Sequence, residues 1–292
     1  MPYREKIIFS AAFLFIVYFV GYALFDTPKI TPEQKKTSAK RIISMSPSNT
    51  ELLFAMGADE EIVGVTTYCD YPPQALTKEK IGSFYTPDIE KIISLRPDLV
   101  LANSTLQAEY IRQLRRANIS VLPVNTEDID KTLTSIDFIA QAIGREKEGA
   151  LLIARLNSYR LEAKELLERY PSNKRVFIEV WDKPILTVGN KSYLNDLIKE
   201  AGGDNVAGQM DMDYFSWDIE RIYVTNPDVY LRLRGVDMGS RADELPEKLK
   251  QLPAVKNGRV VTIFGDWIVR PGPRSIEALP QIIRELYGTP GN

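Results

Sequence analysis

The chain opens with a long, uninterrupted apolar run. Residues 7–25 (IIFSAAFLFIVYFVGYALF) contain no charged side chain. At a helical rise of about 1.5 Å per residue, such a run spans the roughly 30 Å hydrocarbon core of a membrane. Arg4 and Lys6 precede it, as positive residues precede the apolar part of an export signal. We therefore predict that residues 1–25 form a signal anchor, with the transmembrane helix at 7–25 and the body outside the cytoplasm.

A polar stretch separates this run from the rest of the chain. Residues 26–40 (DTPKITPEQKKTSAK) hold two prolines and four lysines and show no apolar periodicity. This composition is typical of a flexible stalk. The only cysteine, Cys69, is far from this region, so the predicted tether is the helix and not a lipid-modified cysteine.

From Arg41 onward, short apolar runs alternate with helical patterns. The runs lie at residues 41–45, 61–65, 98–102, 120–124, 175–180, 185–188, 228–233 and 259–264. Short buried runs separated by helices predict parallel strands joined by right-handed crossovers. The first helix is predicted to open at Ser48, because residues 48–51 have the form of a capping box, and to stop at Gly57.

A long amphipathic helix is predicted between the two groups of strands. Its apolar positions are spaced by three and four residues, at Leu152, Leu156, Tyr159, Ala163, Leu166 and Tyr170. Gly144 precedes this stripe and Pro171 follows it, which suits the two ends of a helix. The segment 126–173 is therefore predicted to be a linker built on one stiff helix.

The two groups of strands resemble each other in sequence. Residues 86–101 (TPDIEKIISLRPDLVL) align without gaps on residues 216–231 (SWDIERIYVTNPDVYL), and 52–59 on 197–204. Two unrelated helix-and-strand units are the simpler alternative, but the gapless match favours a duplication. We expect an α/β protein with two pseudo-symmetric lobes, at 41–125 and 174–292, joined by one long rigid helix and preceded by the transmembrane helix. The default ligand site is then the cleft between the lobes.

Composition excludes several classes of function. The chain has no histidine, one cysteine and a net charge of -2. The charge argues against nucleic-acid binding, and the missing histidines remove the commonest general base and metal ligand. No G-x-S-x-G elbow, phosphate loop or dinucleotide fingerprint occurs. We predict a protein that is not an enzyme and has no cofactor, so that any metal arrives inside a bound ligand.

Aromatic residues gather in the predicted connections between strands and helices. They are Tyr68, Tyr71, Phe84, Tyr85, Tyr214, Phe215, Trp217 and Trp267. Ordinary packing explains any one of them, but the set suits a broad, partly apolar ligand held at strand ends. Cys69 is expected as a partly buried filler, and a thiol that faces the ligand is the minority alternative.

Two glutamates occupy matched positions in the repeated segments. Glu90 and Glu220 fall in the first turns of their predicted helices, after Thr86 and Ser216 as expected caps. Negative charge there stabilises a helix by about 0.3–1 kcal/mol. Alternatively, one carboxylate on each lobe suits pairing with two arginines of a twofold-symmetric partner.

Three segments resemble a known family. RIISMSPSNTELLFAMGADEEIVGVTTYCDYPPQA, IGSFYTPDIEKIISLRPDLVLA and RPGPRSIEALPQII are similar to ABC-importer binding proteins with a rigid helical backbone between two lobes. That class takes up cobalamin, ferric siderophores and haem. Residues 68–73 (YCDYPP) are most similar to its cobalamin-binding branch. The resemblance extends from Arg41 to Tyr287.

The resemblance implies a ligand-binding set and a docking pair. The resemblance carries over Tyr68, Phe84, Tyr214, Asp266 and Trp267 as ligand-binding residues. Together with residues singled out by their own positions, the full expected ligand-binding set is Tyr68, Cys69, Asp70, Phe84, Tyr85, Tyr214, Trp217, Asp266, Trp267 and Arg270. Glu90 and Glu220 match the glutamates that dock on arginines of the permease dimer. This chain departs from the family in its predicted helical anchor, and in having Phe84 where a tryptophan is often found.

Several ligands are compatible with these residues. Cobalamin carries its cobalt in its own macrocycle, so the protein need offer no metal ligand. A ferric siderophore is the alternative, because Arg232, Arg234, Arg270 and Arg274 could form a basic wall for an anionic chelate. Haem held by a tyrosine is a further alternative. A periplasmic enzyme on a similar scaffold is disfavoured by the absence of histidine.

Overall fold

The computed structural model describes residues 38–170, 173–235 and 244–288. The predicted membrane span at 7–25 and most of the predicted stalk lie outside these residues. No helix in the described part of the chain combines the length and the apolarity needed to cross a membrane. The last residues of the predicted stalk belong to the body, since the Ser38 hydroxyl donates to the Ile143 carbonyl at 2.6 Å and Ala39 is 7% exposed.

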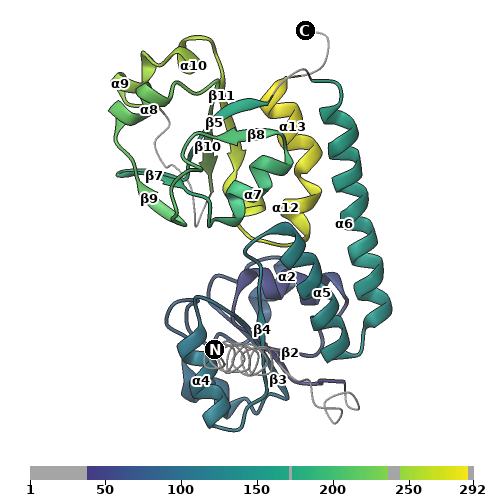
Figure 1. The fold of residues 1–292 in the computed structure, drawn as a ribbon. Coiled ribbons are helices and arrows are strands. Elements are labelled where there is room, and N and C mark those ends of the chain that lie inside the picture. Colours follow the sequence, from purple (N-terminus) through teal and green to yellow (C-terminus); the bar gives the residue numbers. More distant parts are fainter. Residues whose placement is uncertain (1–37, 171–172, 236–243, 289–292) are drawn as a thin grey trace, which may run out of the picture. The chain divides into compact units, whose positions relative to one another are not determined.

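The amino-terminal lobe is built on one parallel sheet (Figure 1). Its elements are β1 (Ile42–Ser44), α2 (Pro47–Ala55), β2 (Ile62–Val65), the 3-10 helix η2 (Pro73–Thr77), α3 (Ile89–Ser94), β3 (Leu99–Asn103), α4 (Ala108–Arg116) and β4 (Val121–Val124). The strand order is β2-β1-β3-β4, and all three pairings are parallel. The carboxyl ends of these strands therefore open on the same edge of the sheet.

The carboxy-terminal lobe repeats this arrangement and adds a small antiparallel sheet. Its parallel sheet has the order β11-β10-β5-β8, and the small sheet has the order β6-β7-β9. The elements are β5 (Lys174–Glu179), β6 (Trp181–Asp182), β7 (Ile185–Val188), α7 (Tyr193–Glu200), β8 (Gly203–Asn205), β9 (Tyr214–Ser216), α8 (Ile219–Thr225), β10 (Val229–Arg234), α9 (Glu247–Lys250), α10 (Pro253–Lys256), β11 (Val260–Phe264), α11 (Gly265–Ile268), α12 (Pro273–Glu277) and α13 (Leu279–Tyr287). Every predicted strand is present. The short strands β6, β8 and β9 were not predicted.

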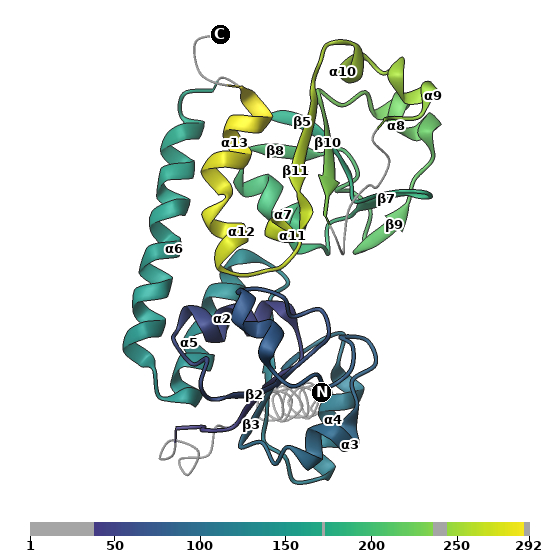
Figure 2. The ribbon, with the colours of Figure 1, turned by 180° about the vertical axis from the view of Figure 1, so that it is seen from behind.

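Two helices connect the lobes. They are α5 (Ile129–Ile143) and α6 (Glu146–Leu167), separated by Gly144 in the left-handed conformation at φ 68°. The predicted apolar stripe of α6 is buried at Leu152, Leu156, Ala163 and Leu166. Because α6 packs on α5 and also on α12 and α13, one helix serves both lobes (Figure 2).

The first helix starts earlier than predicted. Pro47 is its first residue, and the cap is Ser46, whose hydroxyl accepts from the Asn49 amide at 3.2 Å. The predicted capping box at Ser48 is therefore wrong. Proline is well suited to the first helical position, because its φ is already helical and the missing N–H would have no partner there. Glu51 is thus available for a different contact.

The duplication predicted from sequence is present in the backbone. In chain order, both parallel sheets place the second strand at one edge, then the first, third and fourth. Leu99 pairs with Ile42 in one lobe, as Val229 pairs with Val176 in the other. The helix-to-strand turns also match, with Arg96 at φ 47° and Asn226 at φ 42°. Two copies of one unit therefore form the two lobes.

A repeated aspartate holds each copy together. The Asp98 carboxylate accepts from the backbone amides of Lys40 and Arg41 at 3.0 Å each. The matched Asp228 carboxylate accepts from the Arg175 amide at 2.8 Å. Each aspartate thus ties the start of the third strand to the start of the first.

We expect Asp98→Asn to cost more stability than Asp228→Asn. A hydrogen bond to a charged group contributes about 1.5–3 kcal/mol when sheltered and less when exposed, and Asp98 accepts two such bonds. The expected losses are about 2 and 1 kcal/mol, measured by urea denaturation. Asp204→Asn, at an exposed position of the second repeat, is the matched control. Equal losses in all three variants would contradict the prediction.

Candidate functional site

The loop after β2 carries exposed tyrosines around a buried cysteine. Tyr68 is 42% exposed and Tyr71 is 43% exposed. Between them, Cys69 is fully buried, and its sulfur lies 3.1 Å from the hydroxyls of Thr50 and Thr66. Burial raises the pKa of the Cys69 thiol above its ordinary value. Cys69 is therefore a core residue, and its predicted contact with a ligand is not supported.

In the other lobe, exposed aromatic residues lie at the end of β11 and in α11. Phe264 is 42% exposed and Trp267 is 43% exposed, with ring centroids 5.8 Å apart in an edge-to-face arrangement. Asp266, between them in sequence, is 5% exposed. The two aromatic residues thus keep open surface while the aspartate is enclosed.

Four charged side chains, one pair from each lobe, connect the lobes beside these two segments. We call Glu51, Asp70, Arg270 and Arg274 the interlobe bridge. The Arg270 guanidinium donates to both oxygens of Asp70, one bond being 3.3 Å long. Arg274 donates from Nε to Glu51 Oε2 at 2.9 Å, and Arg270 Nη1 lies 3.8 Å from Glu51 Oε1. The Arg274 guanidinium also lies 3.9 Å from the centroid of the Tyr71 ring.

The two carboxylates of the bridge have opposite pKa shifts. Burial raises the pKa of Glu51 and outweighs the lowering by Arg274 and Arg270. Partial burial also acts to raise the pKa of Asp70, but the hydrogen bond and charge of Arg270 outweigh it and lower that pKa. Asp70 is therefore held in its ionised form more firmly than Glu51.

A second pair of aromatics lies in the loop before α3. Phe84 and Tyr85 pack edge to face with ring centroids 4.9 Å apart, and Tyr85 is 71% exposed. The buried Gln107 amide donates to the carbonyls of Phe84 and Met45 at 2.8 and 2.9 Å. The Tyr110 hydroxyl donates to the Tyr85 carbonyl at 3.1 Å. These hydrogen bonds fix the backbone of the loop that carries the exposed Tyr85 ring.

The predicted aromatics of the second lobe differ in their surroundings. Tyr214 on β9 keeps 39% of its surface exposed, yet the partial burial of its side chain, followed by the charge of Asp213, raises its pKa to about 12. Trp217 is only 8% exposed, against Phe177 and Phe215. We assign Trp217 to the core and not to the candidate site.

Carboxylates accept hydrogen bonds from Arg232, Arg270 and Arg274 of the predicted basic wall. Arg270 and Arg274 belong to the interlobe bridge. Arg232 is 4% exposed and donates to Glu179 at 3.0 Å, while the Tyr230 hydroxyl donates to the other oxygen of Glu179 at 2.6 Å. Arg234 lines a separate hollow of about 710 Å³ beside β10 and β11, together with Glu244 and Lys250.

The predicted docking glutamates are exposed in the first turns of α3 and α8. The predicted caps were wrong. Asp88 caps α3, accepting from the Lys91 amide at 2.9 Å, and Asp218 stands at the start of α8. Glu220 lies 3.6 Å from Lys248, whereas Glu90 makes no ion pair with another described residue. The two positions therefore match in backbone but not in charge environment.

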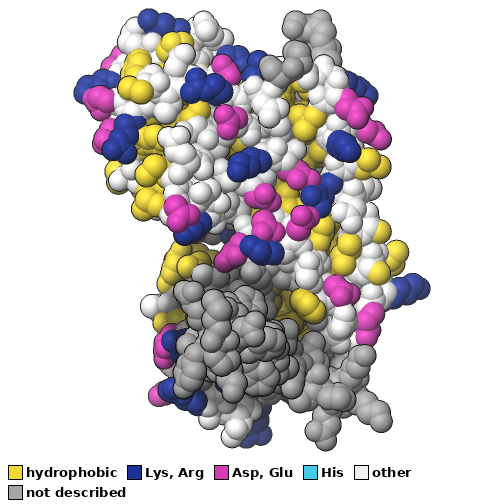
Figure 3. Space-filling model, viewed as in Figure 1, with side chains coloured by type: hydrophobic (Ala, Val, Ile, Leu, Met, Phe, Trp, Pro, Cys, Tyr) yellow, Lys and Arg dark blue, Asp and Glu magenta, His cyan; other side chains and the backbone are white. Residues whose placement is uncertain are grey.

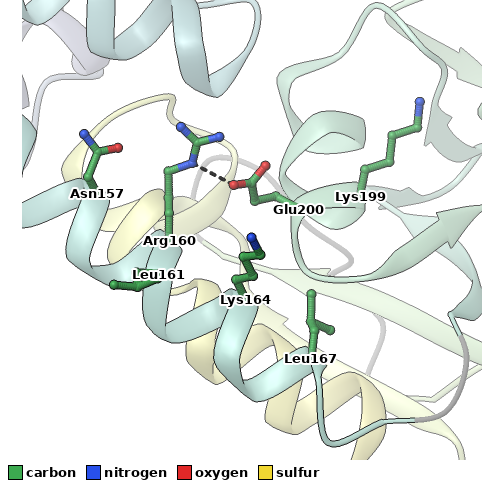
Figure 4. A pocket seen from close by; sticks show the side chains of 7 residues that line it. All are labelled: Asn157, Arg160, Leu161, Lys164, Leu167, Lys199 and Glu200. Atoms are coloured by element: carbon green, nitrogen blue, oxygen red, sulfur yellow. Dashed lines mark hydrogen bonds and ion pairs between the residues drawn. The ribbon is translucent and has the colours of Figure 1, made fainter.

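A shallow hollow of about 480 Å³ lies apart from these residues, between α6 and α7 (Figure 4). Arg160 in this hollow donates to Glu200 at 2.6 Å and to Asp130 at 2.8 Å. It thereby joins α5, α6 and α7. Figure 3 shows charged side chains of both signs interspersed over the described part of this face. We interpret the hollow as a structural joint.

Comparison with known proteins gives a consistent result. A family model described as "Periplasmic binding protein" matches residues 42–266. An uncharacterized ABC transporter substrate-binding lipoprotein, YvrC, of Bacillus subtilis is 34% identical over 86% of this chain and 81% of its own. The crystal structure of the periplasmic vitamin B12 binding protein BtuF of Vibrio cholerae superposes with a TM-score of 0.75 at 28% identity, covering 85% of this chain and 97% of that one. The periplasmic haem-binding protein BhuT, in complex with two haems, gives 0.74 at 25% identity, covering 85% and 97%.

The lowered pKa of Asp70 predicts a stability difference that depends on pH. Ionised Asp70 stabilises the fold at neutral pH, and this contribution disappears as the pH falls through the lowered pKa of the folded state. We expect Asp70→Asn to lower the free energy of unfolding by about 0.5–1 kcal/mol at pH 7, as for a partly exposed pair. Urea denaturation at pH 7 and near pH 3 measures this. A difference of equal size at both pH values would show that Asp70 acts through packing instead of charge.

Proposed function

This chain belongs to the periplasmic binding protein family and is a substrate-binding protein of an ABC importer, and we propose that it captures cobalamin or a related corrinoid where its two lobes meet. Membership of this family confirms the expectation of a carrier that is not an enzyme. It also confirms the two-lobed α/β fold.

One observation carries the choice of ligand. Exposed aromatic rings from both lobes, Tyr68 and Trp267 among them, flank a bridge whose charges are paired. A corrinoid is broad and partly apolar, has uncharged amide side chains, and brings its own metal. Aromatic faces with few polar groups suit such a ligand. The similarity to a vitamin B12-binding protein supports the same choice.

Haem is the second candidate. The structural similarity to a haem-binding protein is nearly as high, and the exposed tyrosines offer phenol oxygens to iron. An anionic ferric siderophore is less well supported, because Arg232, Arg270 and Arg274 each have a carboxylate partner. A ligand with several carboxylates would have to compete for these guanidinium groups.

The family supports a location outside the cytoplasm, and the anchor is a proposal from the sequence of this chain. We propose that the body lies outside the cytoplasm and that residues 7–25 anchor it to the cytoplasmic membrane. The apolar run and the basic residues before it support this proposal. Protease accessibility of the body in intact spheroplasts, with the protein retained in the membrane fraction, is the direct test.

Calorimetric titration of the purified protein tests the ligand. We expect one cyanocobalamin per chain, with a Kd below about 1 µM, which corresponds to about -8 kcal/mol. Tight binding of haem or a ferric siderophore together with no heat or spectral change for corrinoids would reject the proposal in favour of the other ligand.

The aromatic residues should account for part of that affinity. Tyr68→Ala and Trp267→Ala should each weaken corrinoid binding by about 1–3 kcal/mol, because each removes one large apolar contact. Leu161→Ala is the control, since Leu161 is 57% exposed on α6, away from both loops. If both aromatic variants bind as the parent does, the rings are packing residues and the site lies elsewhere.

The glutamates of the repeat should act in delivery. We propose that Glu90 and Glu220 pair with arginines of the permease dimer. The double variant Glu90→Gln/Glu220→Gln should then keep its corrinoid affinity and lose uptake, since charge pairs at interfaces couple by about 1.5 kcal/mol or more. Uptake in cells carrying the matching importer, beside binding in vitro, measures the two effects separately. Normal uptake in the double variant would contradict the docking role, and both glutamates would then act only by stabilising the amino-terminal ends of their helices.

A further inference from the structure

The interlobe bridge combines two guanidinium groups with two carboxylates. Arg270 and Arg274 come from the second lobe, and Glu51 and Asp70 come from the first. In their ordinary ionised forms the four formal charges cancel. The charge of Asp266, which is 5% exposed, also acts on Arg270. Any ligand that rests against the interlobe bridge therefore meets two arginines whose charges are already compensated by carboxylates.

Asp70 is the most exposed member of this bridge. Its side chain is 40% exposed, whereas that of Arg270 is 9% exposed. Glu51 is 3% exposed and Arg274 is 16% exposed, with its guanidinium over the Tyr71 ring. The carboxylate of Asp70 is thus the most accessible charged group of the bridge, and its partner Arg270 is more deeply enclosed.

Asp70 keeps hydrogen-bonding capacity while it is paired. A carboxylate has about four lone-pair sites, and Arg270 donates to each oxygen once. The remaining sites can accept from N–H groups of a ligand. A ligand carboxylate at the same place would instead bring two negative charges together, which is unfavourable where water is partly excluded.

We propose that Asp70 determines specificity: it compensates Arg270 and offers acceptors to the ligand, and so favours uncharged, amide-bearing ligands over carboxylate-bearing ones. This inference rests on the proposed function and adds the chemical class that the site rejects. The proposal has a second consequence. When the charge of Asp70 is removed, the guanidinium group of Arg270 can bind a ligand carboxylate through two parallel hydrogen bonds.

The substitution Asp70→Asn separates these roles, because it removes the charge and keeps the size. Three probes are titrated: cyanocobalamin, its monocarboxylate derivatives with one side-chain amide hydrolysed, and haem with its two carboxylates. The parent should prefer cyanocobalamin to every monocarboxylate, and for at least one of them by about tenfold or more. In Asp70→Asn that preference should fall to near unity, and haem should bind at least about tenfold more tightly than to the parent.

Three further variants identify the cause. Asp70→Glu keeps the charge and should discriminate as the parent does. Asp70→Asn/Arg270→Gln removes both charges and should lose the gain in carboxylate binding. Asp204→Asn, at an exposed position of β8, should leave all three affinities unchanged. Circular dichroism and thermal melting verify that each variant is folded, and Asp70→Ser provides a second neutral variant should the asparagine variant fail to fold.

The outcomes distinguish this inference from the proposed function. Unchanged discrimination in the folded neutral variants, or a gain in haem binding that persists in the double variant, would overturn the role of Asp70. If the parent does not bind cyanocobalamin, the proposed function fails, and the haem titrations alone decide the role of Asp70. If no variant binds any of the three probes, both ideas are wrong.

Discussion

The burial of one carboxylate sets the relation between the two lobes. Glu51 on α2 is 3% exposed, and an unpaired buried carboxylate costs several kcal/mol. Its partner Arg274 is on α12, in the other lobe, where α12 packs on both α2 and α6. Separation of the lobes would leave both charges without their main partners. This ion pair therefore fixes the spacing between the loops that carry Tyr68 and Trp267.

The two lobes also share one hydrophobic core. A single hydrophobic cluster extends from Ile42 in β1 through Leu156 in α6 to Ile282 in α13. Interiors packed in this way resist small continuous deformations. A continuous core beside one stiff helix favours a site that is largely formed before the ligand arrives, so that little ordering cost falls on binding. Adjustment is then confined to exposed rings such as Tyr85.

Local patterns were sufficient for most of the fold. All the parallel strands except β8 are short apolar runs between helices, and α6 has a buried stripe at regular spacing, so these elements can be identified within a few residues. The similarity of residues 86–101 to residues 216–231 predicted that the two lobes share one architecture. The strands β6, β8 and β9 were missed because they are only two or three residues long, too short for an alternation of period two to be recognised. The start of α2 was misplaced because Pro47 moved the cap to Ser46.

The site was less predictable, because its key contacts join residues about 200 positions apart in sequence. Tyr68 and Cys69 are neighbours in a loop, yet one is exposed and the other buried, since loop side chains follow no fixed period. Glu51 was overlooked because a capping box offered it a local explanation. A usable signal did exist: Arg270 and Arg274 lie four residues apart, beside the turn Pro271–Pro273 and within a strongly apolar segment. Two arginines so placed in a buried segment require carboxylates from elsewhere in the chain, and that requirement directs attention to acidic residues of the first lobe.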